Sequence, residues 1–166
     1  MASTEWWQRG PVDGVPAVLQ PVAHILLQVR ESVDELVQGL TDAEWNARPA
    51  GVASAAFHVR HMAGVIDRLF TYARGEVLTD AQKTFARAEA QESSMDAAAL
   101  LAVVKAQIEQ AMKQLGSTDV TTLLDERKIG RAGLPATVMG ALVHGAEHAA
   151  RHAGQCVTTI KILKGV

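Results

Sequence analysis

The sequence is short of several residue types, and each shortage excludes a class of protein. It has a single cysteine in 166 residues, so no disulfide can form within the chain. Aromatic residues make up only 4%, while alanine, leucine and valine are frequent in an apolar fraction of 48%. This mixture favours helices packed on helices over a β-sandwich. No apolar run approaches the roughly 20 residues that a membrane-spanning helix needs.

Neither sign of charge dominates the sequence. The formal net charge is −2, and basic and acidic residues are interspersed. No basic stripe is available to pair with phosphates, so we expect no nucleic-acid partner. The first residues lack the apolar centre of a signal peptide, which together with the lone cysteine predicts a cytoplasmic protein without a membrane partner. The length predicts one domain over residues 1–166, with an irregular segment over 1–15.

Apolar periodicity and capping residues predict four long helices. They span about residues 21–40, 55 to 73 or 74, 94 or 96 to 115, and 135–163. A capping box at 41–44 predicts a short extra helix, the polar segment 79–92 is expected to be helical in its first part, and 117–134 reads as a loop or weak hairpin. We therefore predict an all-α fold, a four-helix bundle with long crossover connections.

Histidines are concentrated in two places along the chain. Two occur on the second predicted helix and three on the last, at positions 58, 61, 144, 148 and 152. Steps of four place the last three on one helix face. The outer two are about 12 Å apart along the axis, too far to share one ion. Neutral imidazole is the commonest metal ligand, so a metal held between two helices is a concrete hypothesis.

The spacing favours His148 and His152 as the ligand pair. Gln155 shares their helix face, and Gly154 beside them allows the close approach of a helix or ligand. His144, one turn earlier, is then expected to support the ligands or to line the pocket.

The third ligand must come from the second predicted helix. His58 and His61 are both candidates, and the residues themselves do not choose between them. Arg68 lies seven residues after His61 on the same helix face, so we assign it, with Gln155, to the surrounding pocket.

Three neutral histidines would leave the charge of a divalent ion uncompensated. Such an ion favours water or an anion in an open position and lowers the pKa of bound water toward about 7. No general base accompanies the ligands, because Glu147 lies about 100° around the helix from His148. Residues 144–148 match the inverted zinc-protease pattern H-x-x-E-H, but no Asp or Glu follows to supply its distant acidic ligand. Catalytic residues thus stay unassigned.

Three segments of the chain resemble the DinB-like superfamily of damage-inducible proteins, also described as metal-dependent hydrolases. They are residues 40–49 (LTDAEWNARP), 54–64 (SAAFHVRHMAG) and 148–155 (HAARHAGQ). The resemblance runs from about residue 20 to 160. It implies one ligand from the second helix and two from the last, which fall on His61, His148 and His152. The extra His58 and His144 depart from the pattern.

The resemblance also implies zinc or nickel as the metal and a homodimer. Characterised relatives include thiol-dependent transferases and isomerases that act with mycothiol or bacillithiol, so a low-molecular-weight thiol is a candidate cofactor. A metal-dependent hydrolase or a thiol-dependent S-transferase is accordingly the expected function, with the small-molecule substrate unknown. The alternatives are a non-catalytic, stress-associated, dimeric metal-binding bundle and a plain helical interaction domain with a histidine-lined core.

Overall fold

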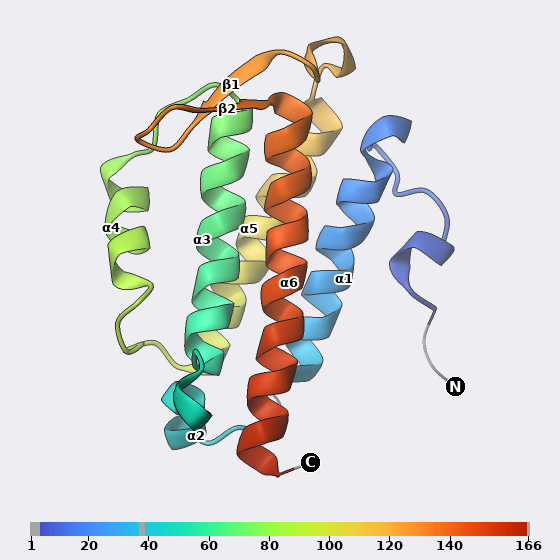
Figure 1. The fold of residues 1–166 in the computed structure, drawn as a ribbon. Coiled ribbons are helices and arrows are strands. Elements are labelled where there is room, and N and C mark those ends of the chain that lie inside the picture. Colours follow the sequence, from blue (N-terminus) through green and yellow to red (C-terminus); the bar gives the residue numbers. More distant parts are fainter. Residues whose placement is uncertain (1–3, 37–38, 166) are drawn as a thin grey trace.

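The computed structural model describes residues 4–36 and 39–165, which are mostly helical (Figure 1). Six α-helices occur in these ranges: α1 Gln20–Leu36, α2 Asp42–Asn46, α3 Ala55–Ala73, α4 Asp80–Ala88, α5 Ala97–Ser117 and α6 Val138–Lys164. The strands β1, Glu126–Ile129, and β2, Leu134–Thr137, form an antiparallel hairpin between α5 and α6. Short 3-10 helices are η1 Trp6–Gln8, η2 Ala17–Leu19, η3 Pro49–Gly51 and η4 Val120–Thr122.

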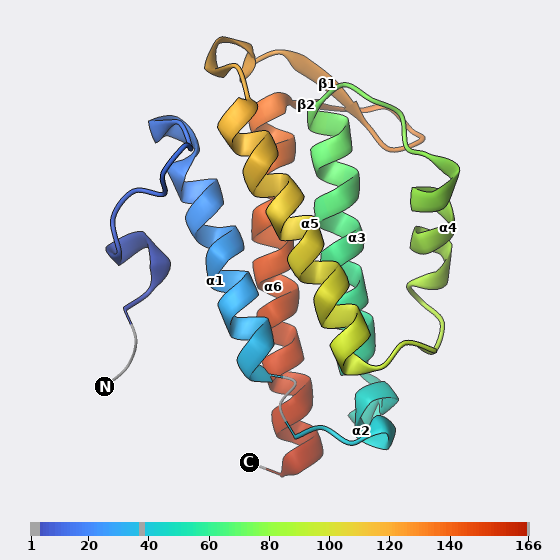
Figure 2. The same cartoon turned by 180° about the vertical axis from the view of Figure 1, so that it is seen from behind.

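The helices α1, α3, α5 and α6 lie side by side and enclose the core (Figures 1 and 2). Both α6 and α5 pack against α3 on one side and α1 on the other. One cluster of buried apolar side chains fills the space between them, and its largest members include Met62, Ile66, Ile108 and Leu142. The prediction of a mainly helical protein is confirmed, and the segment after α5 contains the weak hairpin.

Helix starts follow the capping residues of the sequence. The Ser54 hydroxyl accepts a hydrogen bond from the backbone N–H of Phe57, at 3.1 Å, and so begins α3. Thr41 and Glu44 form the expected reciprocal capping box at α2. Asp96 caps α5 with its carboxylate. These local interactions explain why three helix starts could be read from the sequence.

The last helix begins later than the sequence suggested. Pro135 was expected to start it, but this residue pairs with Lys128 in the hairpin. The cap is Thr137, whose hydroxyl accepts from the backbone N–H of Gly140 at 3.0 Å. The expectation was wrong by less than one turn because the strand β2 runs directly into α6.

Small residues allow α3 and α6 to approach closely, and this pair has the most extensive contact in the fold. Gly145 and Ala149 are buried on the inner face of α6. A Cβ atom built on Gly145 would lie 3.2 Å from the ring of Phe70 on α3. Side chains larger than glycine would therefore push the helices apart. This close contact sets the spacing across which the histidines of the two helices face each other.

The helix α4 packs on the outer side of α3, away from α1 (Figure 1). Gln82 on α4 donates through its amide to the Asp67 carboxylate and the Thr71 hydroxyl on α3, both at 2.8 Å. The expected helical start of the polar segment 79–92 is confirmed. Its remainder, after Ala88, turns back toward the first turns of α3.

The first helix was expected to run to about Leu40. The structure describes α1 to Leu36, and residues 37–38 lie outside the described residues. None of the helices in the described ranges combines the length and apolarity that crossing a membrane would require.

The segment before α1 folds back along that helix. It was expected to be irregular; its described part contains the short η1, and residues 1–3 lie outside the description. The backbone N–H of Trp6 donates to the Gln28 side chain on α1 at 3.2 Å. Trp6 therefore docks on the body of the protein, whereas Trp7 beside it is 65% exposed.

Candidate metal centre

Three histidine rings meet between α3 and α6. His61 comes from α3, and His148 and His152, one turn apart, come from α6. Nε2 of His148 lies 3.0 Å from Nε2 of His61 and 3.2 Å from Nε2 of His152. One ring nitrogen from each residue falls within 4.8 Å of the other two. All three residues are half-buried, so three imidazole nitrogens converge on one sheltered point.

A buried carboxylate holds the far side of the His61 ring. Nδ1–H of His61 donates to Oε2 of Glu89 at 2.6 Å. Arg68 on α3 donates to both oxygens of the same carboxylate. Burial raises the pKa of Glu89, but the hydrogen bonds and charges of His61 and Arg68 more than offset this, and the pKa lies below its usual value. Glu89 is therefore ionised at neutral pH and can only accept hydrogen bonds.

The Glu89 contact decides which nitrogen of His61 is free. Because an ionised carboxylate needs a donor, Nδ1 of His61 carries the proton. In the neutral ring, Nε2 then presents its lone pair to His148 and His152. A carboxylate behind a histidine is the arrangement that orients metal-binding imidazoles and raises their basicity.

The His152 ring is supported by a fourth histidine. Nδ1 of His152 lies 2.9 Å from Nδ1 of His58, so one of the two nitrogens donates to the other. His58 is itself buried, with 4% of its surface exposed. By contrast, Nδ1 of His148 is buried without a hydrogen-bond partner among the described residues. The structure thus separates the roles that the sequence left open: His61 joins the cluster, and His58 lies behind it.

Three of the histidines here, His58, His148 and His152, have lowered pKa values that favour the uncharged ring. Burial, followed by the nearby His61, lowers the pKa values of His58 and His148. Burial also lowers the pKa of His152, to about 4, with smaller contributions from the neighbouring histidines. Neutral imidazoles are the form that binds metal, so His148 and His152 need no deprotonation at neutral pH.

Glu89 reaches the cluster because α3 ties down the chain that carries it. The buried Arg60 donates to the backbone carbonyls of Ala88 and Gln91, which flank Glu89. Gly64 provides the space: a Cβ atom there would overlap Oε1 of Glu89. A pair of contacts on α3, one polar and one steric, therefore positions the carboxylate.

The other predicted site residues lie around the cluster rather than in it. His144 has a side chain that is 53% exposed and faces Glu147, and its ring lies edge-on to that of His148, with the ring centroids 5.2 Å apart. Glu147 pairs with Arg151 in an exposed ion pair, as expected for residues four apart. Gln155 is exposed, one turn beyond His152.

The sequence reasoning missed Glu89. We expected no general base beside the ligands and did not foresee Glu89, which reaches His61 because the segment after α4 folds back across α3. The available signal was indirect. Arg60 and Arg68 occur on a helix whose other residues are mostly apolar, and buried guanidinium groups need acceptors from elsewhere in the fold.

Comparison with known proteins identifies the family. The sequence matches the profile of the DinB superfamily over residues 25–156. The chain belongs to the DinB superfamily. The match spans the histidines of both α3 and α6. No curated protein matches the chain.

A solved structure shares the fold of this DinB protein. It is the crystal structure of a conserved protein from Enterococcus faecalis, with a TM-score of 0.71 and 21% identity. The alignment covers 90% of this chain and 98% of the other. At this identity the likeness shows the fold alone.

The donor set of this DinB protein fits a transition metal ion. Two nitrogens bound to one zinc ion at about 2.0–2.1 Å, at tetrahedral or smaller angles, are about 3–3.4 Å apart. The Nε2 distances of 3.0 and 3.2 Å to His148 fall in this range. Without an ion, these contacts require Nε2 of His148 to carry the proton, which leaves its buried Nδ1 as an acceptor without a partner among the described residues. The imidazole chemistry suits zinc, nickel, copper or iron rather than magnesium or calcium.

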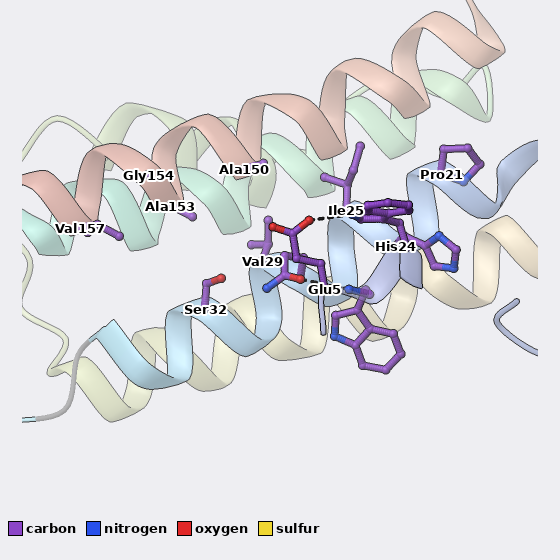
Figure 3. Close-up of a pocket in the computed structure, with 13 residues that line it drawn as sticks. Glu5, Pro21, His24, Ile25, Val29, Ser32, Ala150, Ala153, Gly154 and Val157 are labelled. Atoms are coloured by element: carbon purple, nitrogen blue, oxygen red, sulfur yellow. Dashed lines mark hydrogen bonds between the residues drawn. The ribbon is translucent and has the colours of Figure 1, made fainter. Parts of the chain in front are cut away.

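Two pockets are lined in part by residues of α6, and only the smaller one includes a residue of the cluster. A pocket of about 340 Å³ is lined by His152 and His58 and by residues of α6 beyond them. A larger one, of about 440 Å³, lies between the N-terminal segment, α1 and α6 (Figure 3). Its walls include Ile25, Val29 and Ala153, and none of the three clustered histidines lines it.

Proposed function

We propose that this protein binds zinc or nickel through Nε2 of His61, His148 and His152 and acts as a metal-dependent enzyme. The supporting observation is the convergence of three imidazole nitrogens, one of them held in the metal-binding tautomer by Glu89. Membership in the DinB superfamily is compatible with metal binding. We further propose a cytoplasmic homodimer whose four long helices form the four-helix bundle of DinB type.

The reaction we propose is hydrolysis or the thiol-dependent transfer of a group to sulfur. When bound, the ion supplies Lewis-acid chemistry that lowers the pKa of a coordinated water or thiol. His61 is held from two sides, by Glu89 and by the ring of Phe57, which stacks on it at 5.4 Å with an interplanar angle of 8°. The carboxylate orients the ring, and the phenyl group shields one of its faces from water.

Among the two reactions, the protein's own groups favour the thiol-dependent one. Hydrolysis usually requires a base that moves a proton. The carboxylate that contacts the cluster, Glu89, is buried and committed to His61 and Arg68. Glu147 is paired with Arg151. A thiol activated by the ion alone needs no such base, so a low-molecular-weight thiol is the proposed co-substrate.

The metal hypothesis is tested by elemental analysis of protein purified without a histidine tag. We expect close to one zinc or nickel ion per chain, lost in His148→Ala. His24→Ala is the matched control, because this ring lies on α1, contacts the backbone carbonyl of Gly10 and is outside the cluster. Full metal content in His148→Ala, or equal loss in both variants, would refute the ligand set.

Catalysis is tested separately on metal-loaded protein. Low-molecular-weight thiols are paired with electrophilic acceptors, and thiol consumption is followed in the wild type and in His148→Ala. We expect turnover in the wild type alone. A fully loaded wild type that is silent across a broad panel would favour the non-catalytic metal-binding alternative.

A further inference from the structure

The pocket beside His152 carries no charged residue. Its volume is about 340 Å³, within the range of small-molecule sites. It lies between the start of α3 and the second half of α6. Its walls are Val52, Ala53, Phe57, His58, His152, Gln155, Thr158, Thr159 and Ile162. None of these is Asp, Glu, Lys or Arg, so the pocket offers no counter-charge to a charged molecule.

Most polar groups in these walls are already used. The Thr159 hydroxyl donates to the backbone carbonyl of Ala53 at 3.1 Å. The Thr158 hydroxyl donates to the carbonyl of Gly154 at 3.3 Å. Both threonines therefore present mainly their methyl groups. The remaining surface comes largely from apolar side chains, and Ile162 at its edge is 49% exposed.

His58 connects this pocket to the histidine cluster. Its Nδ1 faces Nδ1 of His152 at 2.9 Å. Its Nε2 has no hydrogen-bond partner among the described residues, yet it is not sealed from solvent as Nδ1 of His148 is. Since His58 is otherwise buried and lines the pocket, that nitrogen opens onto the pocket.

The direction of the His58–His152 bond follows from the proposed function, on which this inference rests. If Nε2 of His152 faces an ion, its proton is on Nδ1, and Nδ1–H must donate to His58. His58 then accepts at Nδ1 and carries its own proton on Nε2. The His58 ring therefore supports the metal-binding His152 through Nδ1 and offers an N–H donor to the pocket through Nε2.

We infer that the pocket is the substrate subsite, that it takes an uncharged, mainly apolar molecule, and that His58 donates through Nε2 to an acceptor on that molecule. His58 is thus a positioning residue with two functions. Its Nδ1 fixes the tautomer of His152, and its Nε2–H orients the substrate in the pocket. The chemical class is an apolar body bearing an oxygen or similar acceptor near its metal-binding end.

Two amide substitutions separate these functions, because they place polar atoms at different distances from the backbone. In His58→Asn the amide lies where Nδ1 was and still accepts from His152, but nothing reaches the position of Nε2. In His58→Gln the amide reaches the position of Nε2 and donates there, but Nδ1 is lost. His58→Leu removes both groups and keeps an apolar side chain in the core.

The first readout is metal affinity, measured by competition with a chromophoric chelator. Loss of a residue that orients a ligand weakens binding about 10- to 100-fold. We expect this loss in the Gln and Leu variants and near wild-type affinity in the Asn variant. Thermal unfolding of each variant checks that it is folded.

The second readout is binding of two probes of equal length to metal-loaded protein, by calorimetry. They are hexanohydroxamic acid and adipic acid monohydroxamic acid, which differ by a terminal carboxylate. We expect the uncharged probe to bind at least about tenfold more tightly, because the pocket offers the terminal carboxylate no partner and burying an unpaired charge is costly. Ile162→Gln should remove this preference, and Val143→Gln, exposed on the same helix outside the pocket, should keep it.

The inference is decided by comparing the Asn and Gln variants of His58 in both readouts, metal affinity and probe binding. The Asn variant should lose affinity for the uncharged probe, and the Gln variant, reloaded with metal, should recover it. Equal effects of Asn and Gln on both readouts would show a merely structural residue and overturn the inference. Tighter binding of the charged probe would also overturn it. Absence of metal from the wild type is a different result, which refutes the proposed function itself.

Discussion

Replacing Gly64 by alanine tests the positioning of Glu89 without touching a ligand. Gly64 is buried on α3, three residues after His61. The new methyl group would overlap Oε1 of Glu89 and lie 2.6 Å from the Arg68 guanidinium and 3.1 Å from the ring of Phe85. Side-chain ends can yield more easily than backbone, so the ion pair is expected to move and the helix to stay.

The size of the effect follows from these distances. Normal contact with a methyl group is about 3.5 Å, so Oε1 of Glu89 must retreat by about 1.5 Å and the Arg68 guanidinium by about 1 Å. The bond from His61 to Glu89 is 2.6 Å and would lengthen beyond hydrogen-bond range. Losing such support weakens metal binding about 10- to 100-fold, equivalent to about 1.4–2.7 kcal/mol.

The assay is chelator competition on Gly64→Ala beside Gly154→Ala. A Cβ atom on Gly154 meets nothing within 4 Å, so this control adds a methyl group to α6, near the ligands, without a collision. We expect unchanged metal affinity in the control and up to about 1 kcal/mol of added helix stability. Equal metal affinity in Gly64→Ala and the wild type would refute the role assigned to Glu89.

Three further predictions follow from the same contacts. Glu89→Gln keeps the size of the side chain but removes its charge, so metal affinity measured by chelator competition should fall about tenfold; undiminished affinity would contradict this. The pKa of His152 falls from 6.5 to about 4 on folding. Metal-free protein should therefore be most stable above pH 6.5, and its free energy of unfolding should decrease as the pH falls toward 4. The loss, by denaturant unfolding, should be about 1–2 kcal/mol for this half-buried ring, and a pH-independent stability would count against it. Burial raises the pKa of the Cys156 thiol to about 12, so iodoacetamide should modify it only upon unfolding; rapid labelling of native protein would show otherwise.

The helices could be predicted because their determinants are local. Ser54, Thr41 and Asp96 cap helices through bonds to residues three positions away. The pairing of His148 with His152 is local as well, since it depends on one helical turn. Periodicity and spacing in the sequence contain this information directly.

The rest of the site depends on contacts between distant segments. Glu89 is 28 residues from His61 in sequence, and nothing near it distinguishes it from other acids of its polar segment. Its position depends on the bonds of Arg60 to the chain around it. The different roles of His58 and His61 likewise follow from how α3 is rotated against α6, which local sequence does not specify.

The most direct test of the account is anomalous scattering from a crystal of protein purified without a histidine tag. We expect one strong peak at the zinc or nickel edge, about 2.0–2.1 Å from Nε2 of His61, His148 and His152. Nδ1 of His61 should still face Glu89. A map without a peak among these three rings, or with the metal bound to His58 or His144 instead, would contradict it.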